Sequence, residues 1–248
     1  SFRRFAQLTP QDGHIVANAD DAGAMDALKG LPLFTFGCCE GADCQARNLT
    51  WQHGRPDFDV VAGGKVYTHL SLRVAGLHNV YNALAAASAA YVLGIPGKAV
   101  RQGLEGFFGA GRRFELKGQY NGARIYDDYA HHPAELHALL DMAKSLGYDR
   151  VICAFQPHTY TRTKALFEDF VQELQIADVV VLTDIYAARE QNTIGISSRD
   201  LADRIPNAYY CPSLRDAAEK LREIARAGDL IITVGAGDIY TVGEMLIS

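Results

Sequence analysis

Carboxylates, imidazoles and a phenol lie within nine consecutive residues, in the segment Asp-Asp-Tyr-Ala-His-His-Pro-Ala-Glu that runs from Asp127 to Glu135. Histidine changes charge near neutral pH, so two adjacent histidines beside two aspartates suit proton handling, phosphate contact or metal binding. Metal binding is the least favoured of the three, because adjacent histidines point in different directions and no third ligand follows at helical spacing. The plainer alternative is a solvated loop in which Asp127 or His132 only caps a helix.

The flanking residues put this segment between a strand and a helix. Residues 124–126 (Arg-Ile-Tyr) are typical of a buried strand, and Pro133 suits the first turn of a helix predicted over Pro133–Leu146. The polar side chains between them should therefore lie on a loop at the carboxyl end of a strand. That edge is where α/β sheets hold their ligands.

A second polar loop, Gln156 to Thr163, follows the next predicted strand. It carries His158 and Arg162, and an arginine can clamp a carboxylate with two parallel hydrogen bonds. The alternative is that Thr161 or Thr163 caps the next helix while Arg162 is solvated. If the sheet is parallel, this loop and the first one lie at the same edge.

Two further loops are expected at that edge. In the segment from Asp184, Arg189 and Glu190 could contribute charge to a site or simply pair with each other at the surface. Residues 235–238 (Gly-Ala-Gly-Asp) begin like a dinucleotide-binding fingerprint, but Tyr240 occupies the position of the third glycine, so NAD binding is disfavoured. A short glycine turn that admits close backbone approach remains the expectation.

The N-terminal half contains a polar entry into an apolar helix, at residues 76–82. Asn79 and Asn82 are three positions apart and so share a helix face, where two amides could read the edge of a purine. Asn79 could instead be the N-cap of that helix. Farther along, Arg112 and Arg113 follow a Gly-Ala-Gly break and could meet phosphate.

The chain divides into two predicted domains, with a boundary at about residue 111. Before it, short β-like runs, a Gly63-Gly64 hairpin turn and helices over Asn79–Leu93 and Ala99–Gly106 indicate an α/β arrangement. After it, strands and helices alternate, which predicts a Rossmann-like, mostly parallel sheet covered by helices on both faces. The predicted strands there are Ile125–Asp127, Val151–Phe155, Val179–Thr183, Ala208–Cys211 and Leu230–Val234, and the predicted helices are Pro133–Leu146, Thr163–Ile176, Ser198–Arg204, Leu214–Ala227 and Asp238–Leu246.

Composition narrows the class of function. With 248 residues, 48% of them hydrophobic, the chain can bury one large core or two moderate ones. A formal net charge of −5 without a basic run disfavours a nucleic-acid surface, so phosphate binding should be local and of the small-molecule kind. No apolar stretch could span a bilayer and no basic-then-apolar leader opens the chain, so we expect a cytoplasmic protein with five reduced cysteines and no membrane partner.

Five motifs together resemble the Mur ligases. They are residues 76–83 (Gly-Leu-His-Asn-x-x-Asn-Ala), 112–115 (Arg-Arg-Phe-Glu), 127–133 (Asp-Asp-Tyr-Ala-His-His-Pro), 156–163 (Gln-Pro-His-x-Tyr-Thr-Arg-Thr) and 186–190 (Tyr-Ala-Ala-Arg-Glu). Their order and spacing also agree with that family, and the resemblance runs from about Phe5 to Gly243. The third and fourth motifs together are highly specific.

By this resemblance, the intact protein would be an ATP-dependent ligase that forms an amide bond in peptidoglycan precursor synthesis. It would use ATP and Mg²⁺ to activate the lactyl carboxylate of UDP-N-acetylmuramate as an acyl phosphate, which the amine of L-alanine then attacks. The runner-up is the family member that attaches a recovered tripeptide to the same sugar nucleotide. A different class is an isolated, non-catalytic module that binds an amino acid or a nucleotide.

The resemblance also implies roles for individual residues. Asn79 and Asn82 would contact adenine, and Arg113 would face the ATP phosphates, where a cation stabilises the growing charge of phosphoryl transfer. Asp128 would lie near the nucleotide, and Arg113 and Asp128 are the expected catalytic pair. Four residues would hold the carboxylate of the amino acid or of the new peptide: Tyr129, His131, His158 and Arg162.

The chain resembles only part of a family member. The family's leading domain, its phosphate loop and its glutamate and histidine magnesium ligands precede the resembling region, and Gly-x-x-x-x-Gly-Lys-Ser/Thr has no match in the chain. We therefore expect residues 1–111 to be the C-terminal part of the central ATP-binding domain and residues 112–248 to be the C-terminal Rossmann-like domain. Without the phosphate loop, this piece alone should not turn over.

Overall fold

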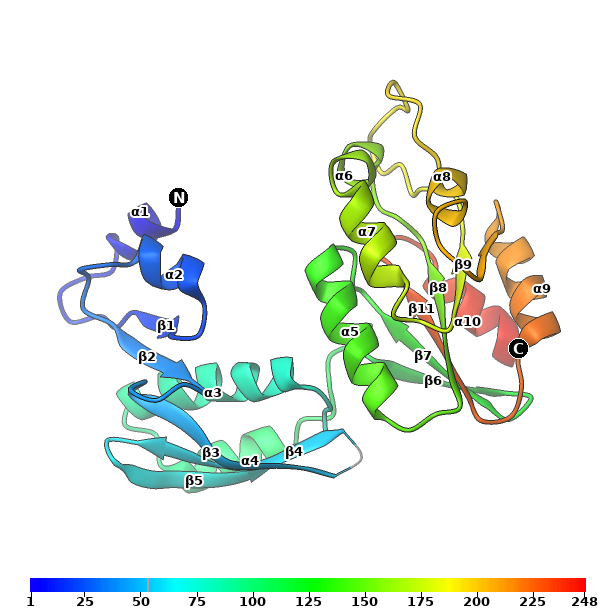
Figure 1. Cartoon of the computed structure of the whole chain (residues 1–248). Helices are drawn as coiled ribbons and strands as arrows, with labels where there is room; N and C mark the ends of the chain where they lie inside the picture. Colours follow the sequence, from blue (N-terminus) through cyan, green and yellow to red (C-terminus); the bar gives the residue numbers. More distant parts are fainter. Residues whose placement is uncertain (53) are drawn as a thin grey trace. The chain divides into compact units, whose positions relative to one another are not determined.

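The computed structural model describes residues 1–52 and 54–248 (Figure 1). Contacts between residues divide these into two compact units, Ser1–Phe108 and Gly109–Ser248. We call them the N-terminal unit and the C-terminal unit and describe each by itself. Among the described residues, no helix is long and apolar enough to cross a membrane.

The N-terminal unit is built on a five-stranded mixed sheet in the order β1-β2-β3-β4-β5. The first three strands are parallel and the last three antiparallel. The strands are β1 (Val16–Asn18), β2 (Phe34–Gly37), β3 (Cys44–Gln52), β4 (Arg55–Ala62) and β5 (Lys65–Ser71). The predicted hairpin is confirmed, because β4 and β5 meet at Gly63 and Gly64, whose φ angles of 58° and 74° favour glycine.

Helix α3 covers one face of this sheet. It spans Leu77–Val92, and its buried residues Val80, Leu84 and Ala87 recur every three or four positions, as an amphipathic helix requires. They join Phe58 and other strand residues in a single core. The remaining helices are α1 (Phe2–Ala6), α2 (Ala22–Ala27) and α4 (Gly97–Glu105).

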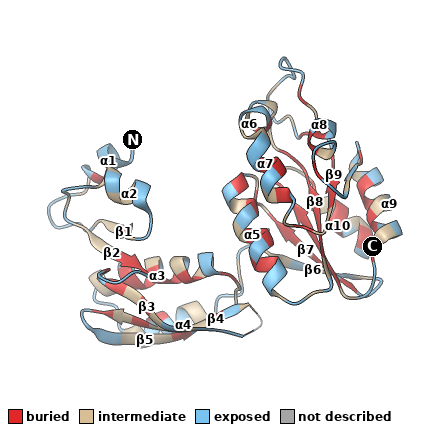
Figure 2. Ribbon diagram, viewed as in Figure 1, coloured by how far each residue is buried: buried red, intermediate tan, exposed pale blue. Residues whose placement is uncertain are grey.

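The C-terminal unit contains a six-stranded sheet in the order β10-β9-β8-β11-β7-β6. Five of its strands are parallel, and β6 is an antiparallel edge strand. The strands are β6 (Glu115–Tyr120), β7 (Ala123–Asp128), β8 (Arg150–Phe155), β9 (Val179–Leu182), β10 (Ala208–Tyr210) and β11 (Asp229–Val234). The central strands are buried along their length (Figure 2), as expected of a sheet covered on both faces.

Helices on both faces complete this unit, which confirms the predicted α/β, Rossmann-like class. Helices α5 and α7 pack against each other over one face, and α9 and α10 pack together over the other (Figure 1). The helices are α5 (Pro133–Ser145), α6 (Tyr160–Ala165), α7 (Phe167–Leu174), α8 (Ser198–Ala202), α9 (Leu214–Ile224) and α10 (Tyr240–Ile247). The prediction of one continuous helix over Thr163–Ile176 is wrong. The backbone leaves the helical region at Leu166 (φ −114°, ψ 25°), so α6 and α7 are separate helices.

Candidate functional site

The loops that follow β7, β8, β9 and β11 meet at the carboxyl edge of the C-terminal sheet. Because β11 pairs with both β7 and β8, and β8 also pairs with β9, these four strand ends are neighbours. The loop after β8 is tied to the loop after β9, where Thr159 N donates to Tyr186 O at 2.9 Å and Tyr186 N donates to Pro157 O at 2.8 Å. The expected shared edge therefore exists within this unit.

His132 is the N-cap of α5, so the plainer alternative holds for this histidine. Its Nδ1 accepts from Ala134 N at 3.4 Å, and Glu135 Oε2 accepts from His132 N at 3.2 Å, which completes a capping box. Glu135 Oε2 also accepts from His131 N at 2.9 Å. The cap fixes the loop and leaves the imidazole of His131 on the side of Tyr129, whose carbonyl oxygen lies 3.0 Å from His131 Nδ1.

Asp127 caps no helix, because its side chain is fully buried inside the sheet edge. Arg112 Nε donates to Asp127 Oδ2 at 2.9 Å, and Thr233 Oγ1 donates to Oδ1 at 2.7 Å. Arg112 also donates to the carbonyl oxygens of Gly235 and Gly237. The guanidinium of Arg112 is therefore engaged within the fold, which leaves Arg113 as the more available of the two arginines for a phosphate.

Asp128 organises the backbone of two loops. Its Oδ2 accepts from Phe114 N and its Oδ1 accepts from Ala130 N, both at 2.8 Å, and the residue is only 7% exposed. Burial raises the pKa of the Asp128 carboxyl, while the two backbone hydrogen bonds and the charge of Arg113 oppose that rise. The carboxylate thus fixes the segment that presents Tyr129.

Four rings form a continuous row along the edge, which we call the aromatic row: Tyr129, His131, His158 and Tyr186. The Tyr129 and His131 rings meet edge to face at 5.4 Å, His131 and His158 are 6.1 Å apart, and His158 stacks on Tyr186 at 5.5 Å between centroids. The exposed guanidinium of Arg113 lies 5.7 Å from the Tyr129 ring. Three of the predicted site residues, from two different loops, are therefore in one row.

Two buried nitrogens beside this row have no hydrogen-bond partner among the described residues: His158 Nδ1 and Arg162 Nη1. Burial, followed by the nearby charges of Arg162 and His131, lowers the pKa of His158, so its imidazole is mainly neutral at pH 7. An unsatisfied buried polar group costs about 1–3 kcal/mol, and more when it is charged. Such groups suit an anionic ligand that would satisfy them.

The threonines of the second loop cap no helix through their side chains. Thr161 instead donates from its N and from its Oγ1 to the Glu190 carboxylate, at 2.9 and 2.5 Å, and these bonds lower the pKa of Glu190. Thr163 Oγ1 donates to Thr159 O at 2.7 Å. Glu190 therefore caps the N-terminus of α6. Its carboxylate binds Thr161 instead of forming the alternative surface ion pair with Arg189.

The glycine turn after β11 approaches its neighbours closely, as predicted. A Cβ at Gly237 would meet Gln156 Oε1 and would lie 2.7 Å from atoms of the Tyr186 ring. Gln156 holds the turn, since its Nε2 donates to Asp238 Oδ1 at 2.8 Å, while its Oε1 is buried without a partner in the described part of the chain. Sequence reasoning included Gln156 and Tyr186 in the motifs that resemble the family but gave neither residue a role at the site.

Asn79 and Asn82 belong to the N-terminal unit, at the start of α3. Asn79 Nδ2 donates to Ala75 O at 2.7 Å, and Asn82 Nδ2 donates to Asn79 Oδ1 at 3.2 Å. The two amides share a helix face, as expected. The N-cap is Gly76 (φ 94°), so the alternative that Asn79 caps the helix is wrong.

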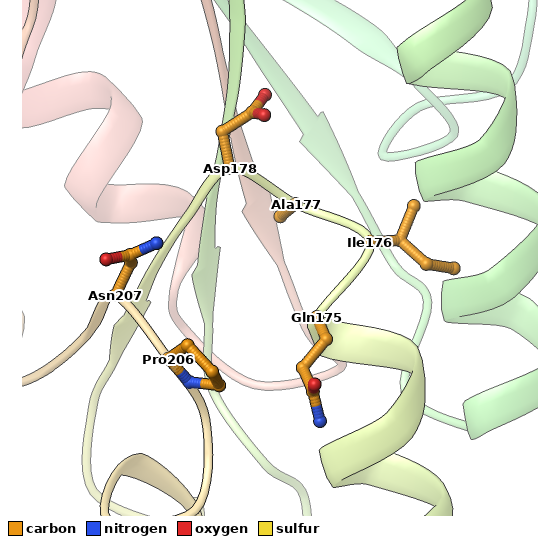
Figure 3. A pocket seen from close by; sticks show the side chains of 6 residues that line it. All are labelled: Gln175, Ile176, Ala177, Asp178, Pro206 and Asn207. Atoms are coloured by element: carbon orange, nitrogen blue, oxygen red, sulfur yellow. The ribbon is translucent and has the colours of Figure 1, made fainter.

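A depression of about 280 Å³ lies near the amino ends of β9 and β10 (Figure 3), away from these loops. Its carboxylate, Asp178, already accepts from Lys144 Nζ at 2.8 Å and from Val151 N at 2.7 Å, so we do not regard it as the site. Across residues 1–52 and 54–248, no group of three or more His, Cys, Asp or Glu side chains could hold a metal ion.

Comparison with known protein families decides the relationship. Residues 112–237 match the Mur ligase, glutamate ligase domain, and residues 1–90 match the Mur ligase middle domain. The chain belongs to the Mur ligase family.

Curated members of the Mur ligase family resemble the chain over nearly all of its length. It is 45% identical to UDP-N-acetylmuramate–L-alanine ligase of Caldanaerobacter subterraneus subsp. tengcongensis, over 98% of this chain and 55% of that protein. It is also 45% identical to the enzyme of the same name from Clostridium novyi, over 100% of this chain and 55% of that protein. The chain thus spans about half the length of the curated relatives it matches.

Solved Mur ligase structures share its fold. UDP-N-acetylmuramate-alanine ligase MurC from Thermotoga maritima superimposes with a TM-score of 0.77 at 27% identity, covering 94% of this chain and 50% of that one. A murein peptide ligase, mpl, from Psychrobacter arcticus superimposes with a TM-score of 0.71 at 25% identity, covering 99% of this chain and 53% of that one.

Proposed function

We propose that the protein containing this chain is an ATP-dependent ligase that joins L-alanine to UDP-N-acetylmuramate through an acyl-phosphate intermediate. It would act in the cytoplasm on small molecules, as a step of peptidoglycan precursor synthesis. The names of the curated relatives support this assignment.

The observation that carries the proposal is the pair of unsatisfied nitrogens, His158 Nδ1 and Arg162 Nη1, beside the aromatic row. A guanidinium remains charged at every physiological pH and forms strong charge-assisted bonds to carboxylates. The carboxylate of L-alanine, or of the new peptide, would bind between them. Tyr129 and His131 would complete the wall of this site, which orients the amine for attack.

The nucleotide would be held by other residues. Asn79 and Asn82 would contact adenine, and the exposed Arg113 would face the phosphates and offset their charge during transfer. Asp128 would act near the nucleotide by holding the segment between Phe114 and Ala130, rather than as a free base, because both of its oxygens accept backbone hydrogen bonds.

The domain assignment is part of the same proposal. Residues 1–111 would be the rear part of the central ATP-binding domain, and residues 112–248 the C-terminal domain. ATP would supply the phosphoryl group and Mg²⁺ would neutralise its charge, with the magnesium ligands outside this chain. We expect this chain alone to be inactive.

Turnover by the full-length protein tests the proposal. ADP release in the presence of ATP, Mg²⁺ and UDP-N-acetylmuramate should rise on addition of L-alanine and should not rise on addition of the tripeptide acceptor of the runner-up ligase. Stimulation by the tripeptide alone would refute it.

Stimulation by the tripeptide alone would favour the runner-up, a ligase that attaches a recovered tripeptide. The structural likeness to the murein peptide ligase of Psychrobacter arcticus supports this runner-up. A non-catalytic binding module is the remaining alternative. The full-length protein distinguishes this alternative from a competent ligase, because a binding module would bind L-alanine in a calorimetric titration and yet release no ADP from ATP.

A further inference from the structure

We propose that Arg112 is a positioning residue that holds both ends of the aromatic row and so sets the width of the amino-acid site. This inference rests on the proposed function for the identity of the ligand. The contacts of Arg112 themselves do not depend on it.

Arg112 holds the Tyr129 end of the row in two ways. Its guanidinium carbon lies 5.0 Å from the centroid of the Tyr129 ring, and its carbonyl oxygen accepts from Tyr129 N at 2.8 Å. On another side, the guanidinium lies 4.8 Å from the centroid of the Tyr240 ring. Its backbone is in the left-handed region, with φ 57°, a conformation that surrounding contacts must stabilise.

Arg112 also holds the Tyr186 end, through the glycine turn. Its Nη2 donates to Gly235 O at 2.7 Å and its Nη1 donates to Gly237 O at 3.1 Å. Gly237 lies so close to the Tyr186 ring that a Cβ there would be 2.7 Å from it. A shift of this turn would therefore shift Tyr186, and with it the stacked ring of His158.

The buried carboxylate of Asp127 fixes the guanidinium between these two ends. Arg112 Nε donates to it at 2.9 Å, and Thr233 on β11 holds its other oxygen. A planar fork can reach three acceptors at fixed angles, whereas the ammonium of a lysine is a single point of charge. Arg112→Lys therefore keeps the charge beside Asp127 and loses the bridge between the two ends of the row.

Arg150 provides a matched control near the amino ends of the same sheet. Its Nε and Nη2 donate to Asp229 at 2.9 and 2.7 Å, and Asp229 is only 1% exposed. Arg150→Lys therefore disturbs a comparable buried ion pair without touching the aromatic row. A purely structural role for Arg112 predicts the same behaviour in both variants.

The test compares Arg112→Lys with Arg150→Lys by two readouts. In this chain, labelled with ¹³C-tyrosine, the ring signals of Tyr129 and Tyr186 should move in Arg112→Lys and stay in place in Arg150→Lys. In the full-length protein, Arg112→Lys should raise KM for L-alanine about tenfold with little change in KM for UDP-N-acetylmuramate, because a loosened wall misplaces only one substrate.

Unchanged ring signals of both tyrosines in Arg112→Lys would overturn the inference. If that variant does not fold, the Arg112→Gln, Asp127→Asn double variant removes both charges of the pair and is judged by the same signals. If the unaltered full-length protein shows no dependence on L-alanine, the proposed function fails, and the tyrosine spectra of this chain still decide the role of Arg112.

Discussion

At the scale of single side chains, two histidines of this chain lie on opposite sides of the ordinary histidine pKa. Burial lowers the pKa of His158, with Arg162 and His131 adding to the effect. His69, on β5, lies 2.9 Å from Asp59 and 3.3 Å from Asp57, and the hydrogen bond to Asp59 is the main cause that raises its pKa. Titration of the ring signals by NMR should give midpoints below and above about 6.5, respectively. The reverse order would contradict the described geometry.

These shifts give opposite pH dependences of stability. The contribution of His69 is fully present below its unfolded pKa and is lost as pH rises through its raised folded pKa. That of His158 is present above its unfolded pKa and is lost as pH falls through its lowered folded pKa. Thermal unfolding should be measured at pH values on both sides of the ordinary histidine pKa. The loss of stability that His69 causes as pH rises should disappear in His69→Gln, and the loss that His158 causes as pH falls should disappear in His158→Asn. Unaltered pH profiles would refute the assignment.

Replacement of Asp128 by asparagine should destabilise the protein by about 1–3 kcal/mol, because one of two buried backbone N–H groups would then face an amide donor. The free energy of unfolding from denaturant titration measures this. The exposed Asp141, on α5, provides the control, and Asp141→Asn should change it by less than about 0.5 kcal/mol. Equal stabilities for the two variants would mean that Asp128 does not organise these loops.

At the scale of elements, the glycine turn after β11 is a steric constraint on the site. Gly237→Ala should destabilise the C-terminal unit by about 1–3 kcal/mol, because its methyl group would overlap the Tyr186 ring. Gly103→Ala is the control, since nothing lies within 4 Å of a Cβ at that position in α4 and alanine is the better helix former. The free energy of unfolding, measured by denaturant titration, should therefore fall in Gly237→Ala and rise in Gly103→Ala. Stabilisation by Gly237→Ala would contradict the contact.

The elements themselves could largely be predicted from the sequence. Runs such as Val151–Phe155 are buried on both faces and so read as strands, and Pro133 marks the start of α5. The edge strand β6 was missed, because Lys117, Gly118 and Gln119 give it little apolar pattern. The break at Leu166 was missed because the amphipathic spacing continues through it.

The contacts of Arg112 could not be predicted in the same way. They join it to carbonyl groups 123 and 125 positions away, and only the folded C-terminal unit brings these groups together. In the sequence, the adjacent Arg113 follows the same Gly-Ala-Gly break and also could meet phosphate, yet it is exposed in the structure. The sequence alone therefore does not distinguish the two arginines. Their burial and their hydrogen-bond partners in the structure do.

At the scale of the whole molecule, the C-terminal unit brings Arg113, Asp128 and the four predicted carboxylate-binding residues to one edge of one sheet. Asn79 and Asn82 lie in the N-terminal unit, at the start of α3. The order of the strands explains why the residues of the C-terminal unit lie at one edge. Strand β11 lies between β7 and β8, and these parallel strands end on the same side of the sheet.

The most direct test of the proposed carboxylate site is the KM for L-alanine of the full-length protein and its Arg162→Lys variant, from ADP release. The account predicts a rise of about tenfold or more, because the lysine cannot reproduce the fork beside His158. Arg204→Lys, which alters an exposed pair with Glu168 and a contact with the Phe167 ring, should leave KM within about twofold of the unaltered protein. An unchanged KM in Arg162→Lys would contradict the central claim that this guanidinium binds the amino-acid carboxylate.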